Sequence, residues 1–159
     1  FRSRMTAAVI VALRIDVAPD IAFAAFTRDI GIWWKSHPLF QISRKGDGVL
    51  RFDPAGPDGR LVTRFEDGKE WEIGPVRHWL PGEHLAFGWR LPSFRDDQAT
   101  EVDVRFEAVG DATRVTVEHR GWDSIPQKHV ARHGFELTLF QRRLGEFWRG
   151  LLKAIEAGL

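Results

Sequence analysis

Apolar and polar residues alternate over much of this chain, which is the pattern of a sheet with one buried face. Val9, Val11, Leu13 and Ile15 recur at every second position near its beginning, and a period of two places such side chains on one side of a strand. Further segments with this pattern follow, separated by turns that contain glycine and proline. Strands are predicted at residues 9–17, 49–53, 60–66, 69–80, 84–91, 100–108 and 113–120.

Two short helices and one long helix are predicted beside these strands. Pro19 suits the first turn of a helix, and the apolar residues that follow it form one stripe. A second short helix is expected at residues 29–35, where apolar residues recur at helical spacing. After Pro126 the apolar residues stand three or four apart, so residues 127–157 are expected to contain a long amphipathic helix.

The order of these elements predicts an α+β fold. Strands joined by short turns pair antiparallel, and their single apolar face needs a cover. Only the terminal helix is long enough, among the predicted elements, to provide that cover. We therefore expect a helix-grip fold, in which a curved antiparallel sheet wraps around the long C-terminal helix and the two short helices close one end.

Composition and charge narrow the classes of function. The chain has 159 residues and a formal net charge of +1, so nothing in its charge points to nucleic acid as a partner. It contains no cysteine, which excludes disulfides, thiol nucleophiles and thiolate metal ligands. No apolar run approaches the roughly twenty residues that cross a bilayer, so membrane insertion is not expected. We expect a cytoplasmic protein with one domain at residues 5–159, residues 1–4 being a remnant of expression.

Aromatic residues give the strongest indication of function. Seven tryptophans and twelve phenylalanines occur without a single tyrosine. Aromatic-lined interiors of this kind commonly hold a small molecule, although the rings could equally fill the space themselves. The candidate ligand-binding residues of this apolar set are Trp33, Trp34, Phe52, Trp71, Trp79, Phe87, Trp89, Phe106, Phe140, Leu144 and Trp148.

Arg77 is one candidate for fixing a polar end of such a ligand. Strand parity places it on the same face as Trp71 and Trp79, and a buried guanidinium needs a carboxylate, a carbonyl or an acidic ligand group as its partner. The alternative is a pleat disturbed at Gly74-Pro75, which would turn Arg77 toward solvent because proline removes a donor from the ladder and favours bulges.

His119 is the second polar candidate for the ligand-binding site. It shares parity with Val115 and Val117, so its imidazole is expected on an apolar face, where it could bind a ligand or transfer a proton. The alternative is a core histidine satisfied by a backbone carbonyl. No acidic residue with inward parity lies nearby in the sequence to orient the imidazole for catalysis.

Motifs for metal binding and covalent catalysis are incomplete in this chain. His129 and His133 stand four apart near the start of the expected long helix, but a third ligand and the glutamate of a metalloprotease helix are missing. We interpret them as exposed helix residues. No serine nucleophile elbow and no glycine-rich phosphate loop occurs either, so no cofactor and no metal are expected.

Several segments resemble a known family. They are WEIGPV at 71–76, WLPGEHLAF at 79–87, TEVDVRFE at 100–107 and TRVTVEH at 113–119. They are similar to bacterial homologues of the activator of the 90-kDa heat-shock protein ATPase, in the START-like (SRPBCC, helix-grip) superfamily. The resemblance covers the chain from about residue 9 onward. It implies the helix-grip fold and a function among those of the superfamily: lipid carriers, hormone binders, aromatase/cyclases and chaperone regulators.

These observations favour a binding protein over an enzyme. The leading hypothesis is non-enzymatic binding of a small hydrophobic or aromatic molecule in a cavity between the sheet and the C-terminal helix. One alternative is a chaperone-associated or stress-response interaction module, and another is an aromatase/cyclase-type enzyme. A homodimer is also expected, because relatives often pair and an aromatic-rich chain can expose an apolar patch.

Overall fold

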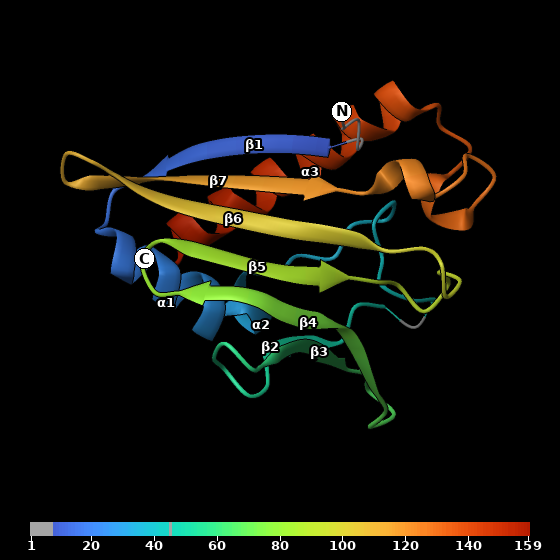
Figure 1. The fold of residues 1–159 in the computed structure, drawn as a ribbon, viewed down its shortest axis with the longest axis horizontal. Coiled ribbons are helices and arrows are strands. Elements are labelled where there is room, and N and C mark those ends of the chain that lie inside the picture. The colour runs from blue at the N-terminus through green and yellow to red at the C-terminus, as the bar shows by residue number, and fades with distance from the viewer. Residues whose placement is uncertain (1–7, 45) are drawn as a thin grey trace.

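The computed structural model describes residues 8–44 and 46–159, and these form a curved antiparallel sheet around one long helix (Figure 1). The predicted remnant at residues 1–4 lies outside the described residues. Within them, seven strands pair in the order β1-β7-β6-β5-β4-β3-β2, and every neighbouring pair is antiparallel. The strands are β1 (Ala8–Ile15), β2 (Val49–Phe52), β3 (Arg60–Arg64), β4 (Glu70–Leu80), β5 (His84–Trp89), β6 (Thr100–Val109) and β7 (Ala112–Arg120).

The helices occupy the predicted parts of the chain, with one correction. α1 (Pro19–Arg28) begins at the proline, and α2 (Ile30–Trp33) follows it directly. α3 (Leu137–Ala157) starts at the cap residue Glu136, whose side chain accepts a 3.0 Å hydrogen bond from the Leu139 backbone N–H. Residues 127–136 therefore precede α3 and are not part of it. They contain a 3₁₀ turn (Val130–Arg132).

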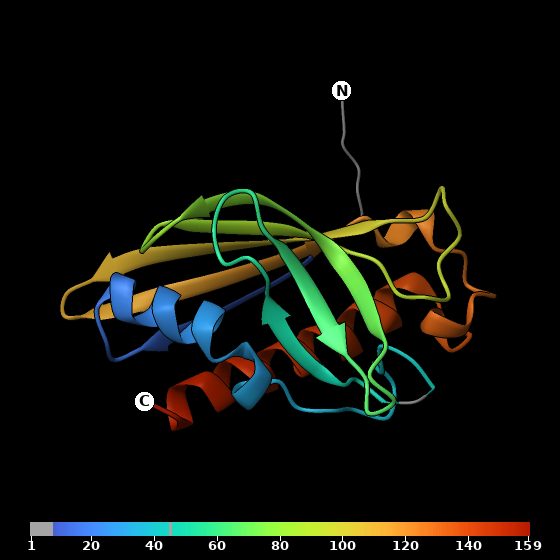
Figure 2. The same cartoon turned by 90° about the horizontal axis from the view of Figure 1, so that it is seen from below.

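α3 lies along the inner face of the sheet, and the sheet curls over it (Figure 2). The apolar stripe predicted from spacing is the buried side of this helix, with Phe140, Leu144, Trp148, Leu151 and Ile155 all buried. α1 and α2 cover the same inner face at one end of the sheet. The α+β helix-grip architecture expected from the order of elements is confirmed.

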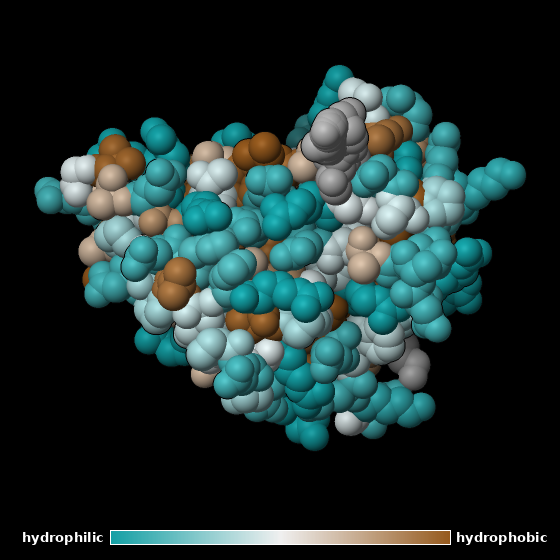
Figure 3. Space-filling view, in the orientation of Figure 1, coloured by the Kyte–Doolittle hydropathy of each residue, from teal (hydrophilic) through white to brown (hydrophobic). Residues whose placement is uncertain are grey.

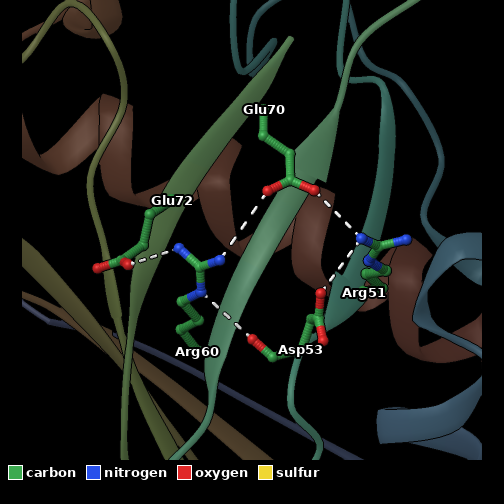
Figure 4. A network of polar contacts seen from close by, with 5 residues as sticks. All are labelled: Arg51, Asp53, Arg60, Glu70 and Glu72. Atoms are coloured by element: carbon green, nitrogen blue, oxygen red, sulfur yellow. Dashed lines mark hydrogen bonds and ion pairs between the residues drawn. The ribbon is translucent and has the colours of Figure 1, made fainter. Parts of the chain in front are cut away.

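The outer face of the sheet is largely hydrophilic, with only scattered apolar side chains (Figure 3). Ion pairs cross the strands at its β2–β4 end, where Arg51 lies 3.1 Å from Glu70 and Arg60 lies 3.2 Å from Glu72 (Figure 4). Arg51 also reaches Asp53 at 3.2 Å. Exposed pairs of this kind contribute little stability, roughly 0–1 kcal/mol each. The apolar material of the fold is thus concentrated between the inner face and α3.

Candidate ligand-binding pocket

A pocket of about 440 Å³ lies between the inner face of the sheet and α3, where β5 and β7 end. This volume is within the range of small-molecule sites, roughly 300–1,000 Å³. The loop at residues 38–44 and the segment at residues 130–133 close its sides. Its apolar lining includes Trp34, Leu39, Phe40, Ile42, Trp89, Leu91, Trp122, Val130, Leu144, Phe147 and Trp148.

Several predicted site residues meet at this pocket. Trp34, Trp89 and Trp148 form a wall of buried rings, with 5.3 Å between the ring centroids of Trp34 and Trp89 and 5.9 Å between those of Trp34 and Trp148. His119 and Leu144 also line the pocket. These residues come from distant parts of the chain, so the fold assembles this wall.

Several other predicted residues lie away from the pocket, toward α1. There the rings pack on one another: Phe23 and Phe52 lie 5.3 Å and 5.5 Å from Trp79, and Phe52 lies 5.5 Å from Phe87. The alternative that rings fill the interior describes this end of the molecule. The predicted site residues outside the pocket lining are Trp33, Phe52, Trp71, Arg77, Trp79, Phe87, Phe106 and Phe140.

The expected inward orientation of Arg77 is wrong. Its side chain is exposed, because the β3–β4 register shifts before it: Val62 pairs with Glu72 and Leu61 with Gly74, which leaves Ile73 as an extra residue. The extra residue of such an irregularity reverses the side of the sheet on which following side chains lie. The alternative of a disturbed pleat near Gly74-Pro75 is the one that the structure supports.

His119 is a fully buried, neutral histidine with both ring nitrogens in use. The Trp148 Nε1–H donates to Nδ1 at 3.1 Å, so Nδ1 carries no proton and the hydrogen of the ring is on Nε2. That nitrogen lies 2.9 Å from the Thr100 Oγ1, which in turn donates to the Trp89 carbonyl at 2.7 Å. Burial lowers the pKa of His119 to about 3.

The geometry of His119 therefore fits the core-histidine alternative. Its partners are the side chains of Thr100 and Trp148, where a backbone carbonyl was expected. A proton could reach Nδ1 only after the Trp148 hydrogen bond breaks. His119 presents an uncharged ring to the pocket and is poorly suited to acid–base chemistry.

The loop at residues 38–44 is a part of the pocket that sequence reasoning missed. It is held by the buried carboxylate of Asp47, which accepts hydrogen bonds from the Trp34 Nε1 at 3.0 Å and from the Ile42 backbone N–H at 2.8 Å. In the sequence, Asp47 stands between Gly46 and Gly48, a pattern that indicates only a turn. A signal was present in principle, since aspartate between glycines often bonds nearby backbone N–H groups.

The segment at residues 129–133 closes another side of the pocket through two histidines. The His129 Nε2 donates to the Ser93 carbonyl at 2.9 Å, and the His133 Nε2 donates to the Leu39 carbonyl. The expectation that both residues belong to the long helix is wrong, because they flank the 3₁₀ turn that precedes it. His133 has a left-handed φ of 52°, which ends this turn. Within the described residues, no cluster of His, Asp or Glu is arranged to hold a metal.

Arg132 holds the segment at residues 129–133 in place through hydrogen bonds to the backbone on either side of it. Its guanidinium is buried and donates to the backbone carbonyls of Ile125 at 2.9 Å and Phe135 at 2.7 Å, and it lies 5.3 Å from the ring centre of Phe140. Burial lowers the pKa of Arg132, and the Glu136 carboxylate opposes that shift. The residue thus acts as an internal brace of residues 125–136.

A second hollow of about 550 Å³ lies beside α3, and Phe40 and Phe147 line both it and the pocket. Its lining includes Lys35, Arg143 and Glu146, the last two forming a 3.2 Å ion pair. Because the pocket is walled by buried indole rings and this hollow by exposed charged side chains, the pocket is the better candidate for an apolar ligand.

A curved antiparallel sheet that grips a C-terminal helix, with a pocket between them, defines the START-like class of protein. Residues 16–147 match the family described as Activator of Hsp90 ATPase homolog 1-like protein. The chain belongs to this family. The resemblance expected from the segments at 71–87 and 100–119 is confirmed.

Solved structures of low sequence identity share this fold. Mll3558 from Rhizobium loti is 23% identical with a TM-score of 0.64, and 98% of each chain is covered. The Aha1 dimer from Colwellia psychrerythraea is 19% identical with a TM-score of 0.60, covering 96% of this chain and 95% of the other. PFC0360w, an HSP90 activator from Plasmodium falciparum, is 18% identical with a TM-score of 0.60 and 94% coverage of both chains. Among curated proteins, none matches the chain.

No helix in the described residues has both the length and the apolar character needed to span a membrane.

Proposed function

We propose that this protein binds a small apolar molecule, rich in aromatic or other flat surface, in the pocket between the sheet and α3. The observation that carries this proposal is the pocket of about 440 Å³ whose walls include Trp34, Trp89, Trp122 and Trp148. Indole rings offer large, rigid contact surfaces at a small cost in side-chain entropy. Such a wall favours stacking against a flat ligand.

The proposed role is binding without turnover. Enzymatic acid–base chemistry needs a group whose pKa lies near the working pH, whereas burial holds the pKa of His119 far below that range. His133, the other histidine of the lining, donates to the Leu39 carbonyl. The two histidines of the pocket lining thus serve its structure.

A fluorescent apolar probe tests the proposal directly. N-phenylnaphthylamine, which is neutral and brightens in apolar surroundings, should bind saturably to the purified protein. Ala131→Trp, which places an indole at the pocket lining, should abolish that signal, whereas Ala157→Trp at the exposed end of α3 should preserve it. Circular dichroism checks that both variants are folded. Equal probe binding by both variants, or none by the unmodified protein, would overturn the proposal.

A second candidate function is association with a chaperone, favoured by the family match at residues 16–147. The protein would then act through an exposed surface, and the Colwellia Aha1 dimer makes a homodimer a reasonable assembly for it. Stimulation of the ATPase of a 90-kDa heat-shock chaperone is the test. Stimulation that survives Ala131→Trp would assign the activity to a surface outside the pocket, and native mass spectrometry would give the oligomeric state.

A further inference from the structure

We propose that the ligand of this pocket is an organic acid, with an apolar body among the tryptophans and an anionic oxygen group bound by Arg44. This inference rests on the proposed function and specifies the chemistry of its ligand. It follows from the polar groups of the pocket lining, taken one at a time.

The charged part of the lining is positive. Arg44 lines the pocket from the 38–44 loop, and in the described part of the chain its guanidinium has no hydrogen bond or ion pair. None of the described residues that line the pocket is aspartate or glutamate. An anionic ligand would therefore meet a cation and no like charge, whereas a cationic ligand would find no counter-charge.

The unpaired hydrogen-bonding groups of the indole wall are donors. Two indoles are already engaged, since the Trp34 Nε1 donates to Asp47 and the Trp148 Nε1 donates to His119. The Trp122 Nε1 is buried without a partner, and the Trp89 Nε1 has none within the described residues either. A buried unpaired donor costs roughly 1–3 kcal/mol. An acceptor oxygen is the ligand group that would relieve this cost.

Arg44 is also held in a suitable place. Its loop is tied down two residues earlier, where the Ile42 backbone N–H donates to the buried carboxylate of Asp47. A guanidinium pairs with a carboxylate or sulfonate through two parallel hydrogen bonds, and such charge-assisted bonds are stronger than neutral ones. The pocket lining thus provides a cation, carried by a tethered loop, beside an apolar wall.

A matched pair of probes separates the anionic group from the ring system. Anilinonaphthalene sulfonate and N-phenylnaphthylamine share their rings, and only the first has a sulfonate. Only binding that Ala131→Trp abolishes is assigned to the pocket, which excludes binding of either probe elsewhere on the protein. We expect Arg44→Gln to weaken binding of the sulfonate about fivefold and to leave the neutral probe unchanged. The loss should shrink at high salt, because salt screens the pair.

Arg114→Gln is the matched control, since Arg114 is exposed on β7 and does not line the pocket. It removes the same charge and should change neither affinity. If the neutral probe binds in the pocket but Arg44→Gln affects the two probes alike, or neither, the organic-acid inference is overturned and the proposed function stands. If neither probe binds the unmodified protein in the pocket, the proposed function fails as well.

Discussion

The Trp148 Nε1 on α3 donates a 3.1 Å hydrogen bond to the Nδ1 of His119 on β7. Both side chains are buried, at 1% exposure each. A polar pair in an apolar interior is satisfied in only one relative position of helix and sheet, because any slip would leave a donor and an acceptor unpaired. This bond therefore fixes how α3 sits on the sheet beside the pocket.

The low pKa of His119 predicts a pH dependence of stability. In the unfolded chain the imidazole takes up a proton below about pH 6.5, but in the folded protein its pKa is about 3. The unfolded state then binds more protons between these values. The stability that the neutral His119 contributes is fully present above pH ~6.5. The free energy of unfolding should therefore fall as the pH drops through this window, by at most roughly 1.4 kcal/mol per pH unit.

Urea denaturation of the unmodified protein and of His119→Gln, at several values from about pH 7.5 to about pH 5, measures this effect. The other histidines contribute alike to both proteins and cancel in the comparison. The unmodified protein should lose stability more steeply on acidification. Parallel pH profiles would contradict a neutral His119.

Arg132 is predicted to stabilise the fold as a brace that lysine cannot replace. Arg132→Ala removes a guanidinium that bonds the backbone carbonyls of Ile125 and Phe135, and should lower the free energy of unfolding by about 2–4 kcal/mol. Arg132→Lys should recover little, because one ammonium lacks the planar fork that spans both acceptors. Urea midpoints measure both effects. Arg142→Ala, an exposed position on α3, is the control and should change stability by less than about 0.5 kcal/mol.

The two facing glycines of β4 and β5 should differ sharply in their tolerance of a methyl group. A Cβ at Gly74 would lie 2.0 Å from the Gly88 carbonyl oxygen, which belongs to the backbone and cannot move aside cheaply. A Cβ at Gly88 would lie 3.2 Å from the Pro75 Cδ. Gly74→Ala should therefore cost about 3 kcal/mol or more and Gly88→Ala about 1 kcal/mol. Thermal unfolding of the two variants measures the difference, and equal costs would contradict the close approach.

Most of the sheet could be predicted because its information is local. Alternation with a period of two, interrupted by turn residues, locates strands without any knowledge of their partners. The same reasoning failed at Arg77, because the register shift at Ile73 depends on how β3 pairs with β4. One extra residue is invisible in an alternating pattern, yet it decides which side of the sheet a side chain takes.

The pocket was less predictable than the fold. Which rings pack together and which leave a space depends on segments far apart in the chain, such as Phe52 against Trp79 and Trp34 against Trp89. The loop at residues 38–44 has no periodicity, and its position depends on bonds to Asp47. Sequence patterns identified the aromatic set, but only the packing separates its pocket members from its core members.

The hydrogen bond from the His133 Nε2 to the Leu39 carbonyl predicts a gate on the pocket. It joins two walls of the lining, the 38–44 loop and the 130–133 segment, and a ligand that enters between them must break it. His133→Asn removes this long donor and tolerates the left-handed φ of 52°. Association and dissociation rates of N-phenylnaphthylamine should both rise about fivefold, which corresponds to one lost hydrogen bond of ~1 kcal/mol.

Stopped-flow fluorescence measures both rates. The equilibrium affinity should change by less than about twofold, because the lost bond eases opening of the empty and the filled pocket alike. Lys128→Asn is the control, since Lys128 is an exposed residue of the neighbouring turn that does not line the pocket. If His133→Asn leaves both rates at the values of the control, the ligand does not pass between these two walls.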